Sequence, residues 1–553
     1  MMRKLSCCLM ALSIMAISCK KGKTVVPDGK KTDPPVVNPP VTNPPENTTS
    51  LVYLHSSGKL YYNKFANEGE TNKDNVVPDF SNAGYKGGGV ALPEIQVKKT
   101  IAAIPGDNRI HIQQAIDEVK NLPQDGNGYR GAVLLQAGTY EVEGTLVIDK
   151  SGVVLRGAGQ GISGTVIKAT KKVQHNLIEL NGTGSGMPEV GGTRKKITTE
   201  YVPTGALSLA IESTSGFNVG DNISVYRVPN QAWIDALDMG QYGWTPGGYD
   251  INFERKIVAI TGNTITLNAP VVDPMQTKYG GGYVFKTNIT GRISNSGVEN
   301  IRLVSYYLND DDELHAWNGI ELNRTENCWV KQVTAQYFGY ACVSLSSMSA
   351  YNTIEECAMV DPKSETTGGR KYSFNLEGGS SFNLFQRCYT SGGRHDYVTG
   401  STVPGPNVFL DSYSTNTKAD IGPHHRWATG VLFDNIQGGQ IIVQNRKAMG
   451  TGHGWAGAQT MFWNCKSPSY DIKVESPKGA MNWGIGCVGA KKNGAGYWES
   501  WGANVLPRSL YIAQLNDRLG STAVNNVTIA AQRTGNIYEL LRTWAGEGKL
   551  ATQ

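Results

Sequence analysis

The sequence is short of histidine, of net charge and of paired cysteines. Only eight of its 553 residues are His, and 52 Lys+Arg against 47 Asp+Glu give a net charge of +5. Without Arg3 and Lys4, which lie in a removable leader, the balance is 50 − 47 = +3, which argues against electrostatic binding of nucleic acid. No C-x-x-C pair appears, so a zinc site of that type is unsupported. No apolar run of about 18 residues follows the leader, so we expect no membrane-spanning helix.

The first 50 residues indicate export and tethering. Residues 1–18 have the charged start and short apolar run of a signal peptide. Small residues before Cys19 resemble the lipobox of bacterial lipoproteins, which implies a lipid on Cys19; the alternative is an ordinary secretory signal with a stray Cys. The rest of residues 19–50 is rich in Pro, which predicts an extended stalk. We therefore expect a protein of the bacterial cell envelope, held to the membrane only by this lipid anchor.

Residues 51–553 have the patterns of a β-solenoid. An amphipathic helix is expected over 107–122, followed by short β-rich runs separated by Gly at 132–136, 138–140, 145–148 and 153–157. This order resembles the pectate-lyase-like superfamily, and the resemblance implies an all-β, right-handed, single-stranded parallel β-helix with an N-terminal capping helix. Hairpin patterns, including Gly262-Asn263 as a tight turn, predict a small antiparallel β-domain inserted at about 207–274.

Repeats after Glu299 support stacked coils. Similar strand patterns centred on residues 328, 357, 388, 412, 435 and 465 are 23–31 residues apart, a spacing typical of solenoids. Cys328, Cys357 and Cys388 are placed in one register, which Cys465 rejoins later. Since the chain is expected outside the cytoplasm, disulfides are possible, but a buried ladder of stacked thiols is the simpler interpretation.

Three segments of this repeat region concentrate polar chemistry. His395, His424 and His453 are spaced 29 residues apart twice, within the range of coil lengths. The three segments are therefore predicted to lie near one wall of the solenoid. Arg and His suit an anionic substrate, and Trp offers flat faces for sugar rings. We expect a substrate-binding wall made of Arg394, Asp396, Arg446, His453, Trp427 and Trp455, which His315 could extend.

The superfamily resemblance implies β-elimination on a uronate-containing polysaccharide. That reaction needs the substrate carboxylate neutralised, a base for the C5 proton and an acid for the leaving oxygen. We assign Arg426 and Arg446 to the carboxylate, His424 or His425 as the base, and His395 or Tyr397 as the acid. Asp396 is expected to orient an imidazole or to pair with Arg394.

The sequence departs from the calcium-dependent members of that superfamily, because its Asp residues are scattered and His dominates. We therefore expect no metal or other cofactor, with Ca²⁺ at the acidic run 310–313 as an alternative. The partner is expected to be an acidic polysaccharide, pectin-like or glycosaminoglycan-like (chondroitin, hyaluronan), bound by a monomer. Two other functions stay open: a glycoside hydrolase using Glu377, Asp396 and Asp420, and a non-catalytic glycan-binding adhesin.

Overall fold

A computed structural model describes residues 49–551 except 185 and 536. The predicted signal peptide, Cys19 and nearly all of the predicted stalk lie outside these residues. None of the helices in the described part is both long enough and apolar enough to cross a membrane.

The body is a parallel β-helix. One ladder of parallel strands runs β3 (Val97–Ile101), β4 (Gly131–Leu135), β7 (Val153–Gly157), β19 (Gly297–Ser305), β22 (Trp329–Gln336), β24 (Thr353–Glu355), β27 (Leu384–Gln386), β30 (Asn407–Thr415), β33 (Val431–Gln437), β36 (Met461–Trp463), β38 (Trp483–Ile485) and β40 (Tyr497–Glu499). A second joins β5 (Gly138–Val142) and β8 (Thr165–Ala169) through the later halves of β19 and β22 to β25 (Ala358–Val360), β28 (Tyr389–Ser391), the later halves of β30 and β33, β37 (Lys466–Val474) and β39 (Val488–Asn493).

The third ladder carries the site. It runs β6 (Leu146–Ile148), β9 (His175–Asn181), β20 (Ala316–Asn323), β23 (Ala341–Ser346), β26 (Phe374–Leu376), β29 (Tyr397–Thr399), β31 (Asp420–Pro423) and β34 (Gln440–Val443). Crossovers between parallel strands are right-handed in almost all proteins, and the fold is the right-handed parallel β-helix that the sequence predicts.

Stacked side chains fill the interior of the coils. Phe385, Phe409, Phe433 and Phe462 occupy paired positions in successive coils, and their ring centroids are 4.9, 5.1 and 5.3 Å apart. Identical positions in successive coils stack at about the strand spacing, so a residue repeated at the coil period forms a continuous apolar column.

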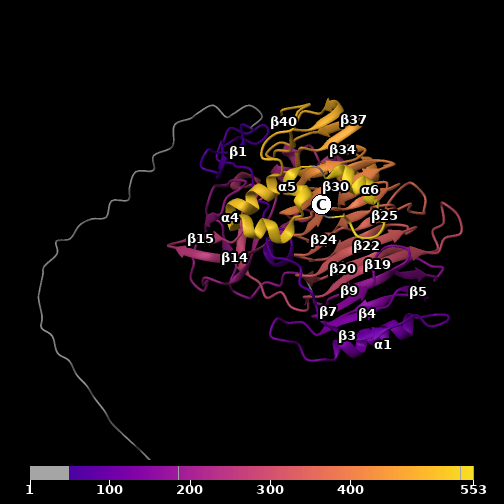
Figure 1. The fold of residues 1–553 in the computed structure, drawn as a ribbon. Coiled ribbons are helices and arrows are strands. Elements are labelled where there is room, and N and C mark those ends of the chain that lie inside the picture. Colours follow the sequence, from indigo (N-terminus) through magenta and orange to yellow (C-terminus); the bar gives the residue numbers. More distant parts are fainter. Residues whose placement is uncertain (1–48, 185, 536, 552–553) are drawn as a thin grey trace, which may run out of the picture. The chain divides into compact units, whose positions relative to one another are not determined.

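Helices close the predicted ends. α1 (Arg109–Lys120) buries Ile112, Ala115, Ile116 and Val119 in the first coils, which confirms the capping helix. Near the C-terminus the chain forms α6 (Tyr538–Trp544). Two further helices were not predicted from the sequence: α4 (Leu510–Val527), which is kinked at Gly520, and α5 (Ala530–Thr534). Figure 1 shows α1 beside the first strands and α4 to α6 against the later coils.

The inserted antiparallel domain is larger than predicted. Its sheet has the order β10 (Lys195–Lys196), β17 (Gly282–Lys286), β13 (Asn222–Arg227), β14 (Ile251–Thr261), β15 (Thr264–Leu267) and β12 (Ser208–Ala210), and α2 (Gln231–Ala236) packs into its core. The turn at Gly262 between β14 and β15 is as expected. The bounds 207–274 were too narrow because β10 and β17 carry no alternating apolar pattern; β17 joins the sheet by pairing with β13, and β10 by pairing with β17.

The cysteine ladder is as predicted for Cys357, Cys388 and Cys465, which share one column of the strand pairing, but Cys328 lies outside it. The six cysteines of the described residues are buried free thiols. Strand pairing places Cys357 opposite Cys388, and Cys465 opposite Cys487. Cys328 is not in this column: it lies opposite Asn352, whose amide donates to Asn383 (2.9 Å) in a neighbouring asparagine ladder. The error arose because coil lengths vary, so a Cys can shift by several positions without disturbing the apparent period.

Candidate active site

Four imidazoles form one continuous cluster on the third strand ladder. The ring centroids of His395 and His424 are 4.2 Å apart, those of His424 and His453 are 5.5 Å apart, and His425 lies 4.8 Å from His453. His395 and His424 are nearly fully buried, with 1% and 5% of their surfaces exposed, whereas His425 and His453 are half-buried. The sequence-derived spacing therefore located a real cluster.

The coil geometry explains this convergence. His395 precedes β29, and His424 follows β31 in the next coil. Pairing of Ala428 with Gly457 carries an offset of 29 residues, which places His424 and His453 in one column. The chain then turns sharply, because the consecutive residues Arg426 and Trp427 both have left-handed backbone angles (φ 54° and 60°). The same backbone conformation recurs at other turns of the solenoid, for example at Asn327, Glu356 and Arg387.

Asp420 organises the buried half of the cluster. Its carbonyl accepts a hydrogen bond from Nδ1 of His395 (2.7 Å), and its Oδ2 accepts one from Arg446 (3.1 Å). Since a carbonyl can only accept, Nδ1 of His395 carries the proton and its Nε2 holds a lone pair. That Nε2 is buried and has no partner among the described residues. The same holds, within the described chain, for Nδ1 of His424, His425 and His453.

The cluster favours neutral imidazoles. Burial lowers the pKa of His395 to about 4, although Asp420 opposes the change. Burial and then the neighbouring histidine and arginine side chains lower the pKa of His425 to about 4. The pKa values of His424 and His453 are also lowered, first by burial. All four are therefore unprotonated bases at neutral pH.

Cations and a cavity flank the imidazoles. Arg394 donates to the carbonyl of Gly368, and Arg426 donates to the carbonyl of Thr451 (2.6 Å). Arg426 and Thr451 also line a cavity of about 380 Å³ together with residues of the insert, among them Tyr242 and Tyr249. The inserted domain thus forms one wall of an opening beside the cluster.

Two predicted site residues, Tyr397 and Asp396, are buried away from the cluster. Tyr397 is fully buried, and its hydroxyl donates to the carbonyls of Cys388 and Tyr413, so it cannot serve as the acid. Asp396 is also fully buried; it accepts from Ser373 rather than from an imidazole or Arg394, and burial raises its pKa to about 6.

The tryptophans also differ from expectation. Trp427 is 1% exposed, packs edge-on against Trp233 of the insert (4.7 Å) and donates its indole N–H to Asp273 (2.9 Å). It docks the insert and offers no face to a sugar. Trp455 is half-buried and packs against the same apolar cluster. His315, expected to extend the groove, is buried with Nδ1 on Ser305 and Nε2 on backbone carbonyls.

Two residues of the cluster, Tyr372 and Asp420, were not predicted from the sequence as part of it. Tyr372 lies 4.9 Å from the ring of His395 and 5.4 Å from that of His424. Asp420 was considered only for hydrolysis. Both could have been found from the coil length: Tyr372 is 23 residues before His395, the offset at which β26 pairs with β29, and Asp420 is 25 residues after it.

The donor atoms here do not fit calcium. Ca²⁺ prefers six to eight oxygen ligands, whereas the three potential ligands that cluster in the described part of the chain are His395, Asp420 and His424. The acidic run suggested as a calcium loop is engaged in ion pairs: Asp310 with Lys363 (2.9 Å) and Glu313 with Arg370 (2.8 Å).

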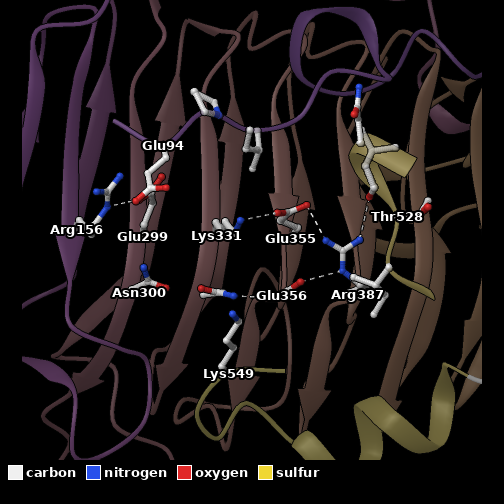
Figure 2. Close-up of a pocket in the computed structure, with 16 residues that line it drawn as sticks. Glu94, Arg156, Glu299, Asn300, Lys331, Glu355, Glu356, Arg387, Thr528 and Lys549 are labelled. Atoms are coloured by element: carbon white, nitrogen blue, oxygen red, sulfur yellow. Dashed lines mark hydrogen bonds and ion pairs between the residues drawn. The ribbon is translucent and has the colours of Figure 1, made fainter. Parts of the chain in front are cut away.

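A second polar cleft lies on the first strand ladder, away from the imidazoles. Figure 2 shows acidic and basic side chains facing one another across neighbouring strands in this cleft of about 510 Å³. Arg387 pairs with Glu355 (2.7 Å) and Glu356 (3.2 Å), and Arg156 pairs with Glu299 (2.6 Å). Arg387 also donates to Gln532 in the C-terminal region. Because these charges satisfy one another, the cleft is explained as an ion-pair network that fixes the C-terminal segment.

Comparisons with known proteins add little about activity. No protein-family model and no curated protein matches the chain. Among solved structures it is similar to ORF18 of Geobacillus virus E2 (12% identity, TM-score 0.36, 73% of this chain and 59% of that one). It is also similar to polygalacturonase from Erwinia carotovora ssp. carotovora (11%, 0.35, 75% and 98%) and to the tailspike of E. coli bacteriophage HK620 in complex with a pentasaccharide (11%, 0.36, 84% and 69%). The chain thus spans 59% of the viral ORF18 protein, and at these TM-scores the fold assignment rests on the strand pairing itself.

Proposed function

We propose that the protein is a polysaccharide lyase that cleaves a uronic-acid-containing polysaccharide, pectin-like or glycosaminoglycan-like, by β-elimination. The observation that carries the proposal is the chain of four contacting imidazoles beside Arg446. In the cell this enzyme would act in the envelope, tethered through Cys19.

The cluster supplies what a uronate requires. The acidity of the C5 proton rises when the neighbouring carboxylate is neutralised, and Arg446, Arg394 and the N–H groups of the imidazoles offer that neutralisation. Binding of the anion in turn raises the proton affinity of nearby imidazoles, because an opposite charge favours their cationic form. The substrate therefore converts weak bases into stronger ones at the moment they are needed.

His425 is our choice for the base. It is more exposed than His424, and burial with nearby cations keeps it unprotonated in the free protein. Tyr372 replaces Tyr397 as the proton donor. Burial raises the pKa of Tyr372, so its hydroxyl stays protonated at neutral pH and can protonate the departing glycosidic oxygen.

The test is an absorbance assay for the unsaturated uronate product against a panel of uronic polysaccharides. We expect absorbance to rise with the wild-type protein and to fall by about 10²–10⁴-fold with His425→Ala or Tyr372→Phe, the usual contribution of acid–base groups. The matched control is Tyr389→Phe, a buried tyrosine of the second strand ladder. New reducing ends without absorbance would indicate a hydrolase, and binding without cleavage would indicate an adhesin; either result refutes the proposal.

A further inference from the structure

We propose that His395, Asp420 and His424 form a binding site for a divalent transition-metal ion of the Zn²⁺ class. One potential ligand atom from each residue lies within 4.8 Å of the others. All three residues are buried, so the ligands are held by packing rather than by solvent-exposed loops.

The free atoms are the ones that a metal requires. Nδ1 of His395 donates to the carbonyl of Asp420, which leaves the lone pair of Nε2 unused among the described residues. Metal-binding histidines characteristically donate their other ring N–H to a carbonyl or carboxylate. Nδ1 of His424 is likewise buried and has no partner in the described part of the chain. A buried polar atom without a partner carries a cost that ligation removes.

Asp420 is also arranged as a ligand. Arg446 holds its Oδ2 at 3.1 Å, and Oδ1, the oxygen available to a metal, lies 3.5 Å from Nδ1 of His395. Ligands bound at about 2.0–2.2 Å lie about 3.3–3.5 Å apart in a tetrahedron, so side-chain rotation must bring the three donor atoms closer together than the 4.8 Å within which they lie for the site to close. Two imidazoles and one carboxylate are typical of zinc sites that retain an open position.

The open position determines what the metal could do. His425 and His453 continue the ring contacts from His424 toward the half-buried edge of the cluster. A metal ion held by the three ligands would be a Lewis acid for an anionic oxygen arriving from that edge. This role rests on the proposed lyase function, whereas the binding site itself does not.

The experiment measures binding directly. The full chain, stripped with a chelator and dialysed, is titrated with Zn²⁺ by calorimetry, and bound metal is counted by elemental analysis. We expect one equivalent, not displaced by excess Ca²⁺. Loss of a residue that only supports a metal ligand weakens metal binding by about 10- to 100-fold. Asp420→Asn and His424→Gln remove ligands themselves, so each should weaken Zn²⁺ binding by at least that factor. His111→Gln, which changes a histidine of α1 remote in the fold from the cluster, should leave binding unchanged.

The outcomes separate the two proposals. Absence of stoichiometric Zn²⁺ binding, or binding indifferent to both cluster variants, overturns the metal site. If the variants do not fold, Co²⁺ added to the wild-type chain decides: visible absorption of a four-coordinate ion supports the site, and the spectrum of hydrated Co²⁺ refutes it. A chain that binds Zn²⁺ but cleaves no uronic polysaccharide would retain the metal site and refute the lyase.

Discussion

Replacing Trp427 by Ala should destabilise the protein rather than weaken substrate binding. The side chain is 1% exposed, and its indole packs against Trp233 at 4.7 Å. Truncating a buried Trp costs about 3–5 kcal/mol. The indole N–H also donates to Asp273 at 2.9 Å, and removing a hydrogen bond to a buried charge costs about 1–3 kcal/mol more. The expected loss in the free energy of unfolding is therefore about 4–8 kcal/mol.

Denaturant titration monitored by circular dichroism measures this loss. Trp427→Phe should recover most of the packing and lose only the part due to the hydrogen bond. Trp455→Ala is the matched control, because that side chain is half-buried against the same cluster and should cost less. A loss below about 1 kcal/mol for Trp427→Ala, or a loss of polysaccharide affinity at unchanged stability, would refute the docking role.

Three further predictions concern titration and thiols. Asp396→Asn should stabilise the protein above pH 6, because burial raises the pKa of Asp396 to about 6 and ionisation of this carboxyl destabilises the folded state as pH rises through that value. The free energy of unfolding measured at pH 5 and at pH 8 tests this prediction, and an equal effect of the substitution at both pH values would contradict it. The pKa of His395 is about 4 in the folded protein and about 6.5 in the unfolded chain, so the free energy of unfolding should fall by about 3 kcal/mol as pH drops from 6.5 to 4. His395→Gln should make the free energy of unfolding less dependent on pH in this range, and an unchanged pH dependence would exclude His395 as its cause. The six cysteines of the described residues should resist thiol reagents until the chain unfolds, and reductant should leave the melting temperature unchanged; rapid labelling of the native protein would argue against the ladder.

The sequence allowed prediction where its signals are local or repeat at the coil length. The apolar spacing of Ile112, Ala115, Ile116 and Val119 predicted α1, and the 29-residue spacing located His424 and His453 in one column. Burial of Trp427 could not be predicted in this way. Its partners, Trp233 and Asp273, belong to the insert and are more than 150 residues away in the chain.

The residue-by-residue register between successive coils could not be predicted from the sequence either. Coils differ in length, so the period tells which residues are near one another but not which are directly opposite. For this reason His395 and His424 were expected in one column, although strand pairing places His424 level with Gly400. The rings meet nonetheless: His395 precedes β29, His424 follows β31 in the next coil, and their ring centroids are 4.2 Å apart.

The segment that precedes the first coil affects the order in which the protein can fold. Ser50 bonds to Tyr497 in the last coil, the backbone of Tyr85 bonds to Thr353, and the carbonyl of Ile95 accepts from Arg156. Figure 1 shows β1 (Val52–Leu54) near β40, at the end of the solenoid away from α1. Residues 49–96 therefore run against the order of the coils. They are made first but contact residues as late in the chain as Tyr497, so this segment can complete its contacts only when nearly the whole chain is present.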